Sequence, residues 1–103
     1  MPLRFTWDEA KATTNRAKHK ISFDIAARVF LDPFALSEQD RIEDGEYRWR
    51  TIGSVDGVTI LLVAHTTHDE EDGTESVRII SARRAKQSER RRYEEEKYRQ
   101  LRT

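Results

Sequence analysis

The stretch that decides the fold is WRTIGSVDGVTILLVAHT, residues 49–66. Its centre, Asp56-Gly57, is a hairpin signal, because both residue types readily adopt the positive φ angles of a two-residue turn. The β-branched and apolar residues on either side predict two antiparallel strands, Tyr47–Val55 and Val58–Thr66. An antiparallel sheet is therefore expected in the middle of the chain.

The segments around this hairpin extend the pattern in both directions. Further strands are predicted at Leu3–Thr6, Phe34–Gln39 and Ser76–Ala82, joined by the acidic turn Ile42–Gly45 and the polar loop Thr67–Glu75. Helices are predicted from an Asp8 cap to about His19, from a Ser22 cap over Phe23–Phe30, and from Arg84 onward. The expected fold is α+β with a mostly antiparallel sheet, in the order β-α-α-β-β-β-β-α. We expect one domain over residues 1–103, with residues 94–103 as a charged helical tail.

The composition excludes several classes of protein. The chain has 103 residues and no cysteine, so disulfide frameworks, thiolate zinc sites and cysteine nucleophiles are excluded. No apolar run approaches the roughly 20 residues of a membrane span, and no signal-peptide pattern opens the chain. No phosphate-binding glycine loop or serine-triad signature occurs either. A cytoplasmic protein without a membrane partner or cofactor is expected.

The net charge of zero conceals a strong polarity along the chain. Residues 1–20 carry a balance of +3, residues 21–76 a balance of −9, and residues 77–103 a balance of +6. A protein with this distribution can bind an anion through its two ends. A charged surface that merely keeps a small domain in solution is the simpler interpretation.

The first cluster of candidate functional residues lies on the first predicted helix. Lys11, Asn15 and His19 are spaced at i, i+4 and i+8 and therefore share one face, with Lys18 beside them. The lysines could contact phosphate, and the imidazole could carry a proton near neutral pH. An exposed polar helix face explains the same residues without a ligand.

The second cluster surrounds the junction of the last strand and the last helix. Arg78, Arg83, Arg84 and Lys86 lie where a helix N-terminus offers free N–H groups, and guanidinium forks match phosphate oxygens. Glu89 and Tyr93 follow Ala85 at i+4 and i+8, on a stripe that can face the sheet. Glutamate could orient an arginine or act as a base, and tyrosine could donate a proton. Ion pairing along a surface helix is the alternative.

Two further clusters lie on the central strands. His65 to Asp72 reads HTTHDEED, but His65 and His68 point to opposite faces of a strand and the calcium-loop pattern is missing, so no metal site is predicted. His65 remains a candidate acid, base or phosphate contact. Glu46, Arg48 and Arg50 alternate on one strand face with Tyr47 and Trp49 on the other, which predicts either cross-strand ion pairs or a floor of arginines beneath a phosphodiester.

The sequence resembles the BrnT family of toxins. The resemblance covers residues 5–93 and is carried by Phe5-x-Trp7-Asp8, Lys11, Asn15-x-x-Lys18-His19, Ile21-x-Phe23, Val29-Phe30-x-Asp32-Pro33, Arg48, Ile52-Gly53, Arg78-Ile79-Ile80-Ser81-Ala82-Arg83 and Glu89-Arg90-x-x-Tyr93. It implies a RelE-like fold and a metal-independent endoribonuclease toxin that arrests translation. It also implies a BrnA-like ribbon-helix-helix antitoxin, a toxin–antitoxin heterotetramer, and contact with operator DNA only through the antitoxin.

Two positions depart from the pattern of the family. Lys20 stands where the family usually has glycine after the Lys-His pair. His68 and the acidic loop 69–72 stand where a basic residue commonly follows the strand, so His68 is a candidate replacement for that residue.

Metal-free RNA cleavage requires a base for the ribose 2′-OH, cations for the five-coordinate phosphate and an acid for the leaving 5′-oxygen. The residues predicted to be catalytic are Arg78, Arg83, His65, Glu89, Tyr93 and His19. Those predicted to bind substrate are Lys11, Asn15, Lys18, Arg48, His68 and Arg84. A non-catalytic nucleic-acid-binding module and a protein-interaction subunit are the competing hypotheses.

Overall fold

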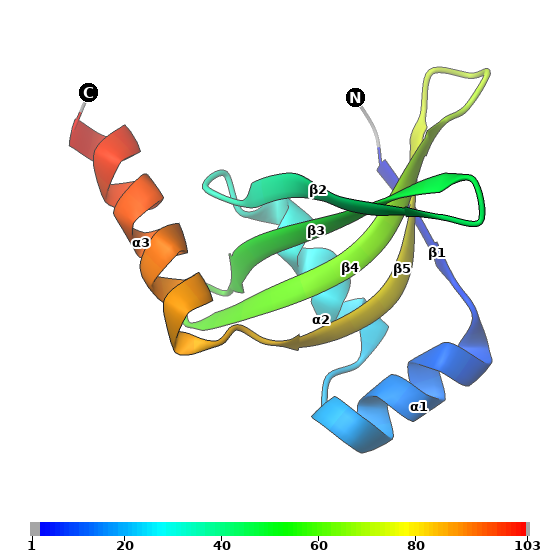
Figure 1. Ribbon diagram of the computed structural model, residues 1–103, viewed down its shortest axis with the longest axis horizontal. Helices are drawn as coiled ribbons and strands as arrows, with labels where there is room; N and C mark the ends of the chain where they lie inside the picture. Colours follow the sequence, from blue (N-terminus) through cyan, green and yellow to red (C-terminus); the bar gives the residue numbers. More distant parts are fainter. Residues whose placement is uncertain (1–2, 103) are drawn as a thin grey trace.

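The computed structural model describes residues 3–102. The elements in chain order are β1 Leu3–Trp7, α1 Glu9–His19, α2 Phe23–Ala27, the 3₁₀ turn η1 Arg28–Leu31, β2 Leu36–Glu43, β3 Glu46–Val55, β4 Thr59–Asp69, β5 Glu75–Arg84 and α3 Gln87–Arg102. The strands form one sheet in the order β1-β5-β4-β3-β2 (Figure 1). All pairs are antiparallel except β1 with β5, so the predicted α+β class and element order are confirmed.

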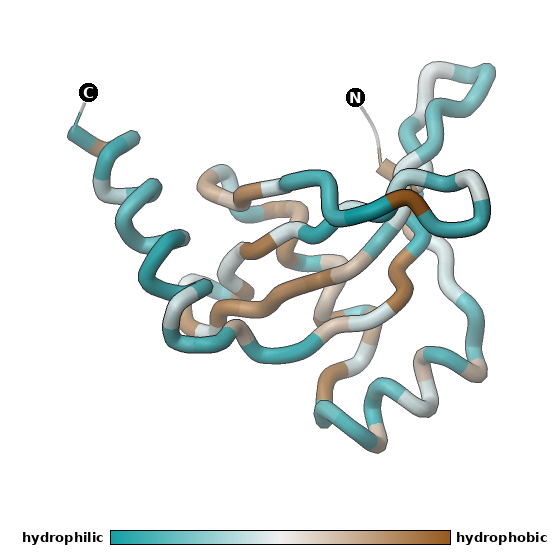
Figure 2. Tube along the Cα trace, in the orientation of Figure 1, coloured by the Kyte–Doolittle hydropathy of each residue, from teal (hydrophilic) through white to brown (hydrophobic). Residues whose placement is uncertain are grey.

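The helices cover the two faces of the sheet unequally. The main core lies on the face packed by α2 and η1, where Phe23, Ala26 and Val29 belong to one buried cluster with Val63 and Ile79. The opposite face is covered at one end by the start of α3, where Tyr93 packs on Ile52 and Leu62. Figure 1 shows the rest of α3 projecting beyond the sheet, and Figure 2 shows that this helix is almost uniformly hydrophilic. Within residues 3–102, no helix covers the remainder of this second face.

A side chain closes the part of the β5 edge that β1 leaves open. β1 pairs with β5 over Glu75–Ile79. Beyond that range, Asn15 of α1 accepts a hydrogen bond from the Ala82 N–H (3.0 Å) and donates one to the Ala82 carbonyl (2.9 Å). The buried amide thereby imitates a neighbouring strand, and it also donates to the Ile21 carbonyl (3.1 Å). Exposed strand edges are prone to unwanted pairing, and Asn15 satisfies the two backbone groups of this edge at Ala82.

Several element boundaries differ from those predicted. β4 continues to Asp69, into the expected polar loop, and β5 continues to Arg84, so α3 begins only at Gln87. The expected helix Phe23–Phe30 is α-helical only to Ala27 and then tightens into η1. The expected strand Phe34–Gln39 begins later, because the Asp32 carboxylate accepts the Phe34 N–H and holds a turn, and it continues to Glu43. The extension is permitted by the tight turn at Asp44-Gly45, where both residues have positive φ.

Close packing and backbone geometry explain two positions of the family pattern. A Cβ at Gly53 would lie 2.9 Å from Val29 Cγ1, so β3 approaches η1 more closely than any side chain allows. Lys20 ends α1 in the left-handed conformation, with φ of 63°. Glycine adopts that conformation without steric cost, which is why it suits this position better than lysine.

Over residues 3–102, no helix is long and apolar enough to cross a membrane.

Candidate nucleic-acid interface

Five arginines stand on the sheet face that α3 covers only in part, and one of them is Arg41 of β2, the register partner of Arg48. Alternation along β4 places Leu62, Ala64 and Thr66 on this face, because Leu62 contacts Tyr93 there. Their register partners share the face, namely Arg83 with Leu62, Arg50 with Ala64 and Arg78 with Thr66. Arg48 lies two residues before Arg50 on the same side of β3. Arg48 and Arg50 thus share one side of the sheet, and Arg50 forms a cross-strand ion pair with Glu38, which is one of the two predicted alternatives. A phosphodiester bound above these arginines stays a prediction.

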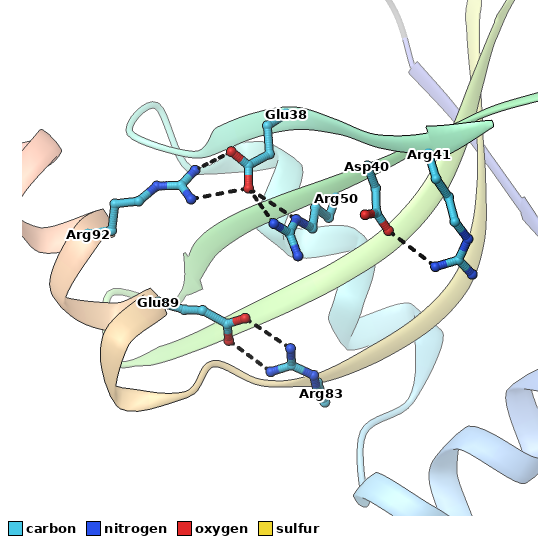
Figure 3. Close-up of polar contacts among 7 residues, drawn as sticks. All are labelled: Glu38, Asp40, Arg41, Arg50, Arg83, Glu89 and Arg92. Atoms are coloured by element: carbon cyan, nitrogen blue, oxygen red, sulfur yellow. Dashed lines mark hydrogen bonds and ion pairs between the residues drawn. The ribbon is translucent and has the colours of Figure 1, made fainter.

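Arg83 forms the best-defined ion pair on this face. Its two terminal nitrogens donate to the two carboxylate oxygens of Glu89 at 2.8 and 3.0 Å (Figure 3). Glu89 also accepts the Lys86 N–H at 2.7 Å, which caps the first turn of α3. The Arg83 hydrogen bonds lower the pKa of Glu89 to about 2, against an opposing contribution from burial. Glu89 is thus ionised at neutral pH and holds Arg83 in one orientation.

Each of the other arginines on this face also has an acidic neighbour. Arg78 donates to Glu46 at 2.7 Å. Arg48 has a side chain only 16% exposed, and Glu43 Oε2 lies 4.0 Å from its Nε. The Arg48 Nε is buried and has no hydrogen-bond partner among the residues described. Arg50 pairs with Glu38, which also binds Arg92 of α3.

His65 lies on the opposite side of the sheet from the arginines. Its side chain is 2% exposed and packs edge-on against Phe30, with ring centroids 4.9 Å apart. Its Nε2 shares a 2.7 Å hydrogen bond with the Thr51 hydroxyl, which in turn contacts Ser37. Burial lowers the pKa of His65 to about 4, so the imidazole is neutral. The structure therefore does not bring His65 together with Arg78 and Arg83.

Tyr93 is buried at the base of α3. Its hydroxyl donates to Asp32 Oδ2 at 2.5 Å, and the same carboxylate accepts the Ser54 N–H at 2.8 Å. Burial would raise the pKa of Asp32, but the hydrogen bonds from Ser54, Tyr93 and Phe34 outweigh it and the pKa lies below its usual value. Burial, together with Asp32, raises the pKa of Tyr93. These contacts join α3 to β3 and η1, so they give Tyr93 a structural role.

The residues of α1 line a separate shallow groove of about 330 Å³ against β5. Lys11, Lys18 and His19 border it, opposite Ile80 and Ser81. Asn15 also borders it, but its amide is already bound to the backbone of Ile21 and Ala82. Hydrogen bonding within the protein therefore accounts for Asn15 without a ligand.

Two predicted substrate contacts lie away from this groove. Arg84 borders a different surface groove with Lys20 and Val58, on the other side of β5 from Arg83. His68 is exposed on β4 and lies near Glu46, whose pKa is lowered mainly by the hydrogen bond from Arg78. Among residues 3–102, no three metal-binding side chains gather into a cluster.

Sequence reasoning missed three residues that organise the interface. Glu38 and Arg92 join β2 to α3 across 54 residues of sequence, and no local pattern indicates such a pair. Asp32 enters the sequence analysis only as one residue of the family pattern, with no role assigned, whereas its carboxylate anchors Tyr93 and two backbone N–H groups. The Asp-Pro pair was the available signal for Asp32.

Comparison with known proteins identifies the class to which this protein belongs. Residues 7–89 match the sequence model of a family of ribonuclease toxins from type II toxin–antitoxin systems. The chain is therefore a toxin of this class, with an α+β fold and a face rich in arginine.

The family is BrnT, and the chain belongs to it. The structure is similar to the crystal structure of the Brucella abortus ribonuclease toxin BrnT, with a TM-score of 0.58 and 30% sequence identity. That match covers 84% of this chain and 100% of the Brucella chain. A comparison with curated proteins finds no match.

Proposed function

We propose that the chain is a metal-independent endoribonuclease that binds the RNA backbone on the sheet face that α3 covers only in part and cleaves it by attack of a ribose 2′-OH. The observation that supports this proposal most is the placement of Arg78 and Arg83 on the sheet face that α3 covers only in part, with Arg83 held by an ionised Glu89. Guanidinium groups keep their charge at every physiological pH, so they can stabilise the extra negative charge of a five-coordinate phosphate.

The reaction moves one proton from the 2′-oxygen and supplies one to the leaving group. The 2′-oxygen bonds to phosphorus as a base takes its proton, the bond from phosphorus to the 5′-oxygen breaks, and an acid protonates that oxygen. The products are a 2′,3′-cyclic phosphate and a 5′-hydroxyl. Arg83, positioned by Glu89, would hold the scissile phosphate. Arg78 would contact a neighbouring phosphate, because its register partner on β4 lies four residues, roughly 13 Å, from that of Arg83.

His19 is the predicted proton carrier best placed to reach a ligand. It is partly exposed and borders the α1 groove beside Ser81, two residues before Arg83 on β5. His65 and Tyr93 are buried, and Glu89 is already paired with Arg83. Lys11 and Lys18 border the same groove and would contact neighbouring phosphates.

We further propose that the toxin acts in the cytoplasm, where RNA cleavage arrests translation, and that a BrnA-like ribbon-helix-helix antitoxin neutralises it in a heterotetramer. The acidic stretch and the basic ends suit a charged protein partner. The antitoxin would cover the arginine face, which is the sheet face that carries Arg41, Arg48, Arg50, Arg78 and Arg83. Only the antitoxin would contact operator DNA. Co-purification with the product of the adjacent gene tests this idea, and a tight complex that still cleaves RNA at the full rate would contradict it.

The central experiment is incubation of the purified protein with labelled RNA in EDTA. We expect cleavage with cyclic-phosphate ends, and loss of cleavage in Arg78→Gln and Arg83→Gln. Arg84→Gln is the matched control, because it removes the same charge on the other side of β5 and should retain activity. Full activity in both face variants would contradict the proposed site, and a requirement for magnesium would contradict the metal-free reaction.

A non-catalytic nucleic-acid-binding module is the second candidate, favoured by the burial of His65 and Tyr93. It predicts salt-sensitive binding of RNA with no product formed.

A further inference from the structure

One carboxylate on the arginine face is held by two guanidinium groups from different elements. Glu38 of β2 receives Arg50 Nε at 3.0 Å and Arg92 Nη2 at 2.7 Å (Figure 3). Both Nε and Nη2 of Arg50 lie 3.0 Å from Glu38 Oε1. Arg92 binds both carboxylate oxygens, because its Nη1 donates to Oε1 at 3.1 Å and its Nη2 donates to Oε2. β3 supplies Arg50 and α3 supplies Arg92, so the two forks approach one anion from two sides.

Two guanidinium forks in this arrangement can bind either a carboxylate or a phosphate. Carboxylate and phosphate both present oxygens at the spacing of a guanidinium fork, and phosphate offers more oxygens. The site is accessible, because the side chains of Glu38, Arg50 and Arg92 are 33%, 40% and 47% exposed. Partly exposed ion pairs contribute little net stability, so a competing anion can replace the carboxylate.

The neighbouring pair on the same face shows what a fixed carboxylate looks like. Glu89 is held by Arg83 and by the Lys86 N–H, and its side chain is only 17% exposed. Glu38, by contrast, has arginine side chains as its only hydrogen-bond partners over the described part of the chain. It can therefore rotate away without leaving a backbone donor unpaired.

We propose that Arg50 and Arg92 form a phosphate subsite that the carboxylate of Glu38 occupies in the unliganded protein, and that a nucleic-acid phosphate displaces Glu38 when it binds. This inference rests on the proposed RNA-binding face and adds a subsite at its α3 end. Because Glu38 competes with phosphate for the two arginines, it lowers the affinity of the toxin for nucleic acid. Arg92 belongs to α3, so a phosphate in the subsite also contacts that helix.

The test compares Glu38→Gln with Glu96→Gln. The latter is the matched control, because it removes the same charge from an arginine pair within α3, away from the sheet. The probe is a fluorescent 2′-O-methyl oligoribonucleotide, which lacks the attacking hydroxyl and is not cleaved. Glu38→Gln should bind the oligonucleotide about 5-fold more tightly than wild type. A plot of log affinity against log salt concentration should also be steeper by about 0.7, because one more phosphate contact releases counterions. Glu96→Gln should change neither quantity.

The double variant Glu38→Gln/Arg92→Gln shows whether the gain acts through the subsite. The gain should disappear in that background. Equal or weaker binding by a folded Glu38→Gln variant, or an undiminished gain without Arg92, would overturn the inference. Thermal unfolding checks the fold of each variant.

Titration with inorganic phosphate separates this inference from the proposed function. In Glu38→Gln, phosphate should shift the Nε–H signals of Arg50 and Arg92 in NMR spectra, and in wild type it should shift them less. If phosphate shifts these signals while no variant binds the oligonucleotide, the subsite stands and RNA binding by this face fails. If phosphate shifts neither signal in Glu38→Gln, the subsite itself is refuted.

Discussion

Lowering the pH from 7 to 5 should destabilise the protein through one buried side chain, His65. Burial lowers its pKa from 6.5 to about 4 in the folded state, whereas the unfolded chain keeps the ordinary value. The unfolded state therefore binds more protons, and the stability present above pH 6.5 is lost as the pH falls. At pH 5 the loss is about 2 kcal/mol, and it levels off below pH 4 at about 3 kcal/mol.

The assay is urea or thermal unfolding followed by circular dichroism at intervals between pH 7 and pH 5. A loss of about 2 kcal/mol lowers the melting temperature of a domain this size by roughly 10 °C. Glutamate carboxylates contribute mainly below this window, because their ordinary pKa is near 4.5.

The variant that isolates the effect is His65→Gln, whose amide can still hydrogen-bond the Thr51 hydroxyl but does not titrate. It should be less stable at pH 7, yet its stability should change little down to pH 5. His68→Gln on the exposed end of β4 is the matched control and should keep the wild-type pH dependence. An unchanged pH dependence in a folded His65→Gln protein would refute the reasoning.

Three further substitutions test the packing. Lys20→Gly should stabilise the protein by about 0.5–1 kcal/mol, because glycine accepts the positive φ at the end of α1; chemical denaturation giving a lower stability would contradict this. Gly53→Ala should cost about 1–3 kcal/mol, since its Cβ would press on buried Val29, and a neutral effect would show that η1 can move. Asn15→Ala should cost about 2–4 kcal/mol by leaving Ala82 without its partners, and hydrogen exchange of the Ala82 amide should accelerate; unchanged protection would rule out this role.

Most of the secondary structure could be predicted because local signals carry it. The hairpin at Asp56-Gly57, the capping Ser22 and the alternation around Val63 are readable within a few residues. Boundaries were less predictable where a side chain intervened, as Asp32 does before β2. Its carboxylate binds Ser54, 22 residues further along the chain, and such a contact leaves no local pattern.

The candidate site was predictable in its residue types but not in its arrangement. Arg83 and Glu89 are six residues apart across a strand-to-helix junction, and their pairing was anticipated as one alternative. His65 was a plausible catalyst by residue type, but the register of β4 turns it toward Phe30 and away from Arg83. Asn15 shared a helix face with Lys11, yet its amide is bound to the β5 backbone.

The sequence by itself determined the element order, the concentration of basic residues toward the two ends and the family resemblance, because each depends on residues close together or on a pattern in linear order. The tertiary structure alone decided that Arg50 and Arg92 meet at Glu38, and that Arg78 meets Glu46 across 32 residues. Alternation along a strand separates two sets of side chains, but only sheet register and helix packing determine which set is buried and which remains exposed to a ligand.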